Sequence, residues 1–139
     1  MQNSIEEILR RAETIAVVGL SDSMMRDSYR IGKMLVEVGY KVYPVNPTID
    51  SFLDIPSYPD LKSLPEPVDI VNVFRNSRYA KEIVRDTIEI GGKVIWFQYG
   101  AEEDEAEAMG REAGLEVISG YCIGVEIRRR GIVKSSVPD

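Results

Sequence analysis

The sequence of 139 residues predicts an α/β fold in a single domain, with a doubly wound, mainly parallel sheet of five strands and helices on both faces. The apolar run at residues 15–18 lacks polar alternation, which is typical of a strand covered on both faces, and further strands are expected at residues 68–74 and 94–97. Segments with helical spacing separate these runs. Strands joined by helices run parallel through right-handed crossovers.

The chain opens with a predicted helix and a predicted strand. Ser4 and Glu7 form a capping box, and the apolar residues that follow have the spacing of one buried helix face: Ile5, Ile8, Leu9 and Ala12. The strand at residues 15–18 ends at Gly19. A polar loop then leads to a helix that we expect Ser28 to cap and Gly39 to end.

The remaining elements continue the alternation. Residues 42–45 form the second strand, whereas five of the seven prolines fall in residues 47–67, which leaves room only for a short strand and one helical turn near residues 60–64. We then expect strands and helices in turn at residues 68–74, about 77–90, 94–97, 102–113 and 115–118. This order is Rossmann-like.

The expected sheet order places the ligand site. For an order of 3-2-1-4-5, the strand order reverses between the strand at residues 15–18 and the strand at residues 68–74. Ligands of such sheets lie beyond the carboxyl ends of the strands at this reversal. We therefore expect Gly19, Leu20 and Ser21 to lie close to Phe74 and Arg75.

Composition excludes several classes of function. With no histidine and Cys122 as the single cysteine, the chain cannot build an internal disulfide, a Cys or His zinc cluster or a Ser-His-Asp triad. A formal charge of −6 disfavours nucleic-acid binding, and the arginine triplet at residues 128–130 is too short to reverse this. Without a leader-like start or a long apolar run, we expect a cytoplasmic protein that is not in a membrane.

The loop at residues 19–29 is the best candidate for an anion site, because it joins a buried strand to the positive end of a helix. Gly19 lets the backbone approach a ligand, Ser21 and Ser28 offer hydroxyls, and Arg26 and Arg30 offer charge. Neither G-x-G-x-x-G nor G-x-x-x-x-G-K-[ST] is present. The alternative is that Gly19 only permits a turn and Ser28 only caps a helix.

The end of the second strand narrows the choice of nucleotide. NAD-binding domains usually place Asp or Glu there for the ribose diol, whereas this chain has Asn46 and Pro47. A neutral residue removes a carboxylate that would repel a phosphorylated ribose. Coenzyme A, with its 3′-phosphate, suits this position better than NAD, while NADP, with a 2′-phosphate, stays open.

The chain resembles the small stand-alone CoA-binding proteins whose domain also forms the amino-terminal part of succinyl-CoA synthetase alpha subunits. The resemblance covers nearly the whole chain and rests on the motifs IAVVGLS at residue 15, SYR at 28, YPVNP at 43, VDIV at 68 and VFR at 73, with Trp96, Gln98 and Cys122. It implies CoA with its pyrophosphate on the loop from Gly19 to Tyr29, its adenosine near Val45 to Pro47, and further contacts at Phe74, Arg75 and Ser77. The histidine that is phosphorylated in the synthetase has no counterpart here.

We therefore expect binding of CoA or an acyl-CoA with no evident catalytic group and no metal. The expected cofactor site is Gly19, Leu20, Ser21, Arg26, Ser28, Tyr29, Arg30, Val45, Asn46, Pro47, Phe74, Arg75, Ser77 and Gln98. An NAD(P)-binding oxidoreductase or a redox-sensing regulatory protein is the alternative function.

Three further expectations concern the end of the chain. Residues 1–127 form the domain, and residues 128–139 form a tail that is flexible or contacts a partner. A homo-oligomer or a protein partner stays open. Cys122 either forms a mixed disulfide with CoA or is a small buried apolar residue.

Overall fold

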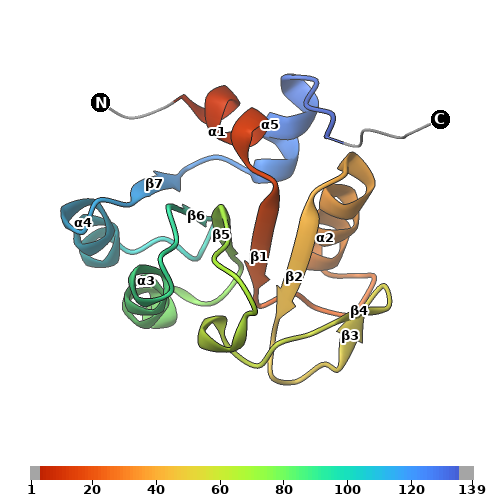
Figure 1. The fold of residues 1–139 in the computed structure, drawn as a ribbon, viewed down its shortest axis with the longest axis horizontal. Helices are drawn as coiled ribbons and strands as arrows, with labels where there is room; N and C mark the ends of the chain where they lie inside the picture. Colours follow the sequence, from red (N-terminus) through yellow and green to blue (C-terminus); the bar gives the residue numbers. More distant parts are fainter. Residues whose placement is uncertain (1–3, 135–139) are drawn as a thin grey trace.

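A single sheet of five parallel strands forms the centre of the computed structural model, which describes residues 4–134 (Figure 1). Its strands are β1 (Thr14–Val18), β2 (Lys41–Val45), β5 (Ile70–Val73), β6 (Val94–Phe97) and β7 (Glu116–Ser119). Every neighbouring pair in the order β2-β1-β5-β6-β7 is parallel. The predicted α/β fold class is confirmed.

The strand order differs from the expected one. Counted among these five strands it is 2-1-3-4-5 and not 3-2-1-4-5. The proline-rich segment contributes only the short antiparallel pair β3 (Ser51–Phe52) and β4 (Ile55–Pro56), with one isolated bridge from Tyr58 to Val45. Proline has no N–H to donate, so this segment cannot extend the sheet as a full strand. The reversal still falls between β1 and β5, as predicted.

Two helix starts test the predicted caps. The capping box at α1 (Ile5–Arg11) is confirmed, because the Ser4 hydroxyl accepts from the Glu7 N–H at 3.1 Å and the Glu7 carboxylate accepts from the Ser4 N–H at 2.9 Å. The predicted cap at Ser28 is wrong: the N-cap of α2 (Asp27–Val38) is Arg26, two residues earlier, and the Ser28 hydroxyl instead accepts from the Ser21 N–H at 3.0 Å. Gly39 ends α2 at φ +115°, as predicted.

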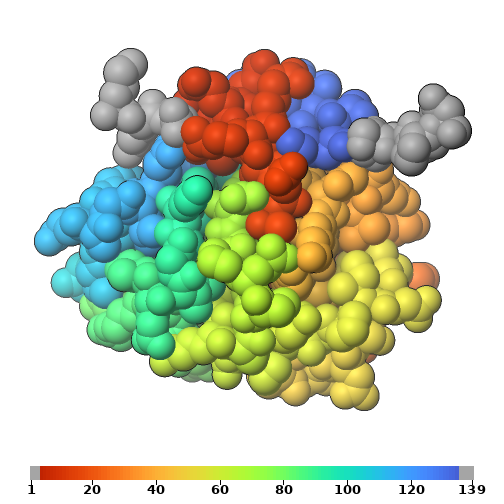
Figure 2. All heavy atoms as spheres, in the orientation of Figure 1, coloured from red at the N-terminus to blue at the C-terminus, as the bar shows by residue number. Residues whose placement is uncertain are grey.

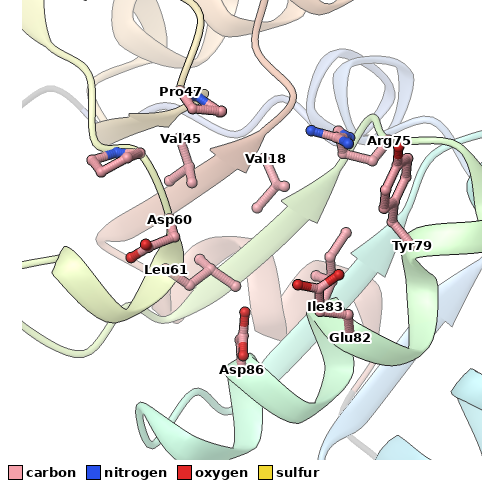
Figure 3. A pocket seen from close by; sticks show the side chains of 11 residues that line it. Val18, Val45, Pro47, Asp60, Leu61, Arg75, Tyr79, Glu82, Ile83 and Asp86 are labelled. Atoms are coloured by element: carbon pink, nitrogen blue, oxygen red, sulfur yellow. The ribbon is translucent and has the colours of Figure 1, made fainter.

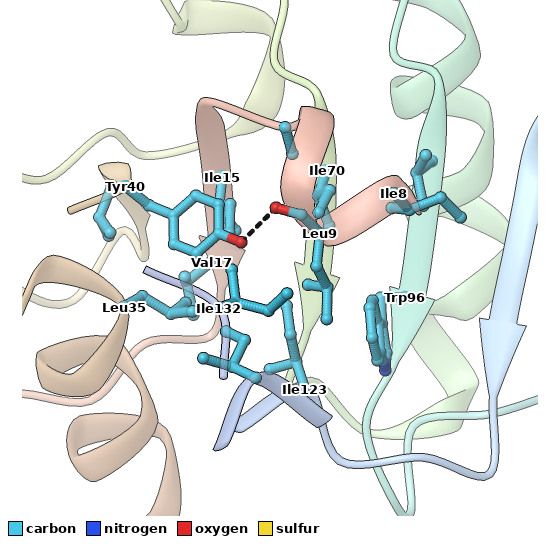
Figure 4. Close-up of a cluster of buried hydrophobic side chains, with 14 of the residues drawn as sticks. Ile8, Leu9, Ile15, Val17, Leu35, Tyr40, Ile70, Trp96, Ile123 and Ile132 are labelled. Carbon is cyan, nitrogen blue, oxygen red and sulfur yellow. Dashed lines mark hydrogen bonds between the residues drawn. The ribbon is translucent and has the colours of Figure 1, made fainter. Parts of the chain in front are cut away.

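The helices cover both faces of the sheet, because successive residues of each strand point to opposite sides. On one face, residues such as Ile15, Val17 and Trp96 pack with α1, α2 and α5 (Ile123–Arg129), and Figure 4 shows part of this cluster. On the other face, Ala16 and Val18 pack with α3 (Ala80–Glu89) and α4 (Asp104–Glu112). The 3₁₀ turns η1 (Leu61–Ser63) and η2 (Ser77–Tyr79) complete this second layer.

The segment after β7 is more ordered than the sequence predicted. Its helix α5 was not predicted, and Ile132, in the expected tail, is 4% exposed. The Lys134 N–H donates to the Val38 carbonyl at 2.9 Å. Residues 128–134 therefore pack on the domain beside α1 (Figure 2), whereas residues 135–139 of the expected tail lie outside the described residues.

Candidate functional site

The carboxyl ends of β1 and β5 approach closely at the predicted site. Gly19 follows β1 at φ +86°, and its N–H donates to the Val45 carbonyl of β2 at 2.9 Å. A Cβ added to Gly19 would lie 3.1 Å from Arg75 Cδ and 3.3 Å from the Phe74 carbonyl carbon. Only glycine fits this turn without strain, because other residues disfavour a positive φ and a Cβ would press on the turn after β5.

The loop after Gly19 is braced by side chains from two other positions. The bond between Ser28 and Ser21 fixes it to the start of α2. The Asn46 amide donates to the Leu20 carbonyl at 2.9 Å, and its oxygen accepts from the Thr48 N–H at 2.8 Å and the Thr48 hydroxyl at 2.7 Å. The Asn46 side chain therefore holds the loop after β1 to the turn after β2.

The start of α2 faces a polar hollow, which we call the central hollow. It has a volume of about 660 Å³, and its lining includes Gly19, Ser21, Arg26, Ser28, Asn46 and Thr48. Arg26 precedes the helix without a side-chain cap bond, and the Tyr29 N–H donates to the Arg26 carbonyl at 3.1 Å. No side chain therefore caps the N–H groups at the very start of the helix, which is where helices bind anions. Arg30 is ion-paired with Asp27.

Two smaller pockets flank the central hollow, and we name each after one residue. The Val45 pocket, of about 220 Å³, lies on the α3 side, and Figure 3 shows Arg75 and Tyr79 along it together with several carboxylates. Burial raises the pKa of one of these carboxylates, Asp86, above its ordinary value. The Cys122 pocket, of about 290 Å³, lies on the α2 side and shares Asp27, Phe74 and Tyr99 with the central hollow. All three openings are lined by residues at or just past the carboxyl ends of the strands, and we refer to them together as the cleft.

Eleven of the fourteen predicted site residues line these openings. They are Gly19, Ser21, Arg26, Ser28 and Asn46 in the central hollow, Val45, Pro47 and Arg75 in the Val45 pocket, Arg30 and Gln98 in the Cys122 pocket, and Phe74 in both the central hollow and the Cys122 pocket. The other three do not line them. Leu20 is buried in the core, and Ser77 begins η2. Tyr29 packs edge-on against Phe52, with 5.2 Å between the centres of the two rings.

Other lining residues were not singled out by the sequence. Tyr99 lines two of the three openings with 69% of its surface exposed, and it directly follows Gln98 past the end of β6. Thr48 follows the second strand in the same way. Because both residues lie just past the end of a strand, the sequence could have indicated them as site residues. Asp60 and Glu82 reach the Val45 pocket through tertiary packing, which no local pattern reveals.

A buried polar pair lies next to the Cys122 pocket. The Gln98 amide donates to the Asn72 side-chain oxygen at 2.7 Å, and the Gln98 oxygen accepts from the Ile123 N–H at 3.4 Å. The Asn72 amide nitrogen is buried without a hydrogen-bond partner in the part of the chain that the structure describes. Gln98 therefore ties β5 to the start of α5 and also lines the pocket.

Cys122 is a free, half-buried thiol at the start of α5. Within residues 4–134, no group of three or more His, Cys, Asp or Glu side chains is arranged to hold a metal ion. No helix in the same residues is long and apolar enough to cross a membrane.

Residues 13–128 match the family model described as CoA binding domain. The chain belongs to this CoA-binding family. The match spans every strand of the sheet and the loop after Gly19. The resemblance seen in the sequence is thereby confirmed.

Relatives of this CoA-binding domain protein include chains of similar length and much longer ones. The uncharacterized protein YneT of Bacillus subtilis is 43% identical over 129 residues, which are 90% of this chain and 96% of YneT. A solved hypothetical protein from Pyrococcus horikoshii OT3 is 35% identical with a TM-score of 0.88, over 93% of this chain and 98% of the other. An ADP-forming acetate–CoA ligase of Archaeoglobus fulgidus is 27% identical over 117 residues, which are 81% of this chain but 17% of the ligase.

Proposed function

We propose that this protein binds coenzyme A or an acyl-CoA in the cleft along the carboxyl edge of the sheet. The observation that carries the proposal is the central hollow, where a glycine at positive φ, an uncapped helix start and Arg26 face the same space. These groups suit a diphosphate, which needs close backbone approach, N–H donors and positive charge.

The flanking pockets suit the two ends of the cofactor. The Val45 pocket combines apolar walls, from Val18, Val45 and Ile83, with carboxylates that can accept from an adenine amino group. The Cys122 pocket is largely apolar and contains Gln98, which suits the pantetheine arm with its thiol or acyl group. The membership of the family favours CoA as the ligand.

The proposal concerns binding and assigns no residue to a reaction. It also keeps the expectation of a cytoplasmic protein, where a free thiol such as Cys122 stays reduced.

Parallel thermal unfolding series with CoA, acetyl-CoA, NADH and NADPH test the proposal. A ligand present at a hundred times its dissociation constant stabilises the folded state by about 2.7 kcal/mol. We expect CoA or acetyl-CoA to raise the melting temperature and the nicotinamide cofactors to leave it unchanged. Stabilisation by NADH or NADPH without any by CoA would favour the NAD(P)-binding alternative instead.

A further inference from the structure

Two arginines flank one tyrosine at the turn between β5 and α3. The Arg75 guanidinium carbon lies 4.0 Å from the centre of the Tyr79 ring, and that of Arg78 lies 5.0 Å from it. Arg78 Nη2 also donates to the Tyr79 hydroxyl at 3.1 Å. This hydrogen bond and the charge of Arg78 lower the pKa of Tyr79. The ring thus orients both guanidinium groups, since stacking and the hydrogen bond restrict their rotamers.

Neither of these two arginines is neutralised within the described residues. Arg30, at the other side of the cleft, is paired with Asp27, whereas no carboxylate lies within ion-pair distance of Arg75 or Arg78 among residues 4–134. Each guanidinium carries five donors in a planar fork that matches a phosphate. The pair therefore offers two unused positive charges to an anion.

Arg75 lies at the proposed cofactor site, and Arg78 lies next to it through its contact with Tyr79, which lines the Val45 pocket. Arg75 lines the Val45 pocket with Tyr79, and its Cδ would be 3.1 Å from a Cβ on Gly19, at the edge of the central hollow. In Figure 3, Arg75 and Tyr79 lie together on one side of the pocket, Asp60 lies on the opposite side, and the carboxylates of Glu82 and Asp86 lie along the bottom between them. A phosphate is repelled by the carboxylate side and attracted to the arginine side.

We infer that Arg75 and Arg78, held by Tyr79, bind the phosphomonoester on the ribose of the cofactor and so select a phosphorylated ribose over an unphosphorylated one. This inference rests on the proposed function. A phosphomonoester carries a charge between about −1.5 and −2 at neutral pH, which two guanidinium groups match. The base then enters the Val45 pocket, while the diphosphate occupies the central hollow.

Calorimetric titration of CoA and dephospho-CoA, which differ only in the 3′-phosphate, tests the inference. The wild-type protein is expected to bind CoA at least about tenfold more tightly, since a charged hydrogen bond contributes about 1.5 to 3 kcal/mol. In Arg78→Gln the affinity for CoA should fall toward that for dephospho-CoA, while the affinity for dephospho-CoA stays unchanged. Arg85→Gln, which removes the same charge from an exposed position of α3 outside the pocket, should keep the wild-type ratio.

Two variants of Tyr79 separate its ring from its hydroxyl. Tyr79→Leu should lower the ratio of the two affinities, and Tyr79→Phe should keep most of it, because the ring still stacks on Arg75. Equal wild-type affinities for the two ligands, or an Arg78→Gln variant that keeps the wild-type ratio or weakens both ligands equally, would overturn the inference and leave the proposed function standing. Failure of both ligands to bind the wild-type protein would instead refute the proposed function.

Discussion

The substitution Gly19→Ala tests the turn on which the site depends. At φ +86° a non-glycine residue costs about 1 to 2 kcal/mol, from which the stiffer unfolded chain returns about 0.5 kcal/mol. The new Cβ would also press on Arg75 at 3.1 Å and on the Phe74 backbone at 3.3 Å, which adds about 1 to 2 kcal/mol as overpacking. We expect a total loss of about 1.5 to 3.5 kcal/mol, or roughly 6 to 14 °C in melting temperature at about 4 °C per kcal/mol.

Gly114→Ala is the matched control for this variant. Gly114 has φ +91° and lies after α4, and a Cβ there would meet no atom within 4 Å. Gly114→Ala therefore introduces the strain of a positive φ without any steric clash. Urea unfolding should show a larger loss of stability in Gly19→Ala than in Gly114→Ala. Calorimetric titration should show weaker CoA binding in Gly19→Ala and unchanged CoA binding in Gly114→Ala. Equal stabilities, or unchanged CoA affinity in Gly19→Ala, would refute the reasoning about close approach at this turn.

Three further predictions concern one titration, one buried pair and one thiol. Burial raises the pKa of Tyr40 to about 12, and its hydroxyl donates to the Leu9 carbonyl (Figure 4). Since the unfolded chain ionises first, near pH 10, this group should contribute its full stabilisation below pH 10 and lose it as the pH rises through about 12, by up to about 2.7 kcal/mol once the folded state also ionises. Urea unfolding across this range should show that loss in the wild type relative to Tyr40→Phe, and parallel curves would contradict it. Gln98→Leu should cost about 1 to 3 kcal/mol because it leaves the buried Asn72 side-chain oxygen without its donor, and adding Asn72→Leu should recover part of the loss in a double-mutant cycle; additive losses would count against a coupled pair. Incubation with CoA disulfide should transfer one CoA unit to Cys122 by thiol–disulfide exchange, with release of one CoA thiol; an intact mass without the adduct, or the same adduct in Cys122→Ser, would argue against this.

The strands could be predicted because they are buried on both faces. Such strands are dominated by apolar, often β-branched residues, and the runs at β1 and β6 show this directly, whereas β5 has the same pattern apart from the buried Asn72. The capping box at Ser4 and the helix end at Gly39 could also be predicted from the sequence, since each depends on residues within one helical turn.

Features that depend on tertiary contacts could not be predicted in the same way. Ser28 had the residue type of a helix cap, but its hydroxyl serves Ser21, which the fold brings beside it. The helix α5 is short and contains Gly124, so its helical signal is weak, and it is held by packing and by the Trp96 indole, which donates to the Tyr121 carbonyl at 2.8 Å. Arg129 and Arg130 each pair with the buried Glu126, so these two arginines stabilise a helix end.

The site follows the same division. The positions at strand ends were predictable from topology, and most of the predicted residues do line the cleft. Leu20 and Tyr29 lie in the same loop and helix start, but they point into packed surroundings, which depends on the local backbone direction and not on residue type. The wall formed by Asp60, Glu82 and Asp86 joins two distant segments.

The hydrogen bonds that Ser28 and Asn46 make to the loop after β1 bear on the kinetics of ligand capture. A loop that is already held by hydrogen bonds within the protein loses little conformational entropy when a ligand binds. Amide exchange at Ser21 should therefore be slow before any cofactor is added, and association should follow a single phase without a preceding rearrangement. The central hollow then behaves as a rigid binding site whose selectivity comes from its shape and charge.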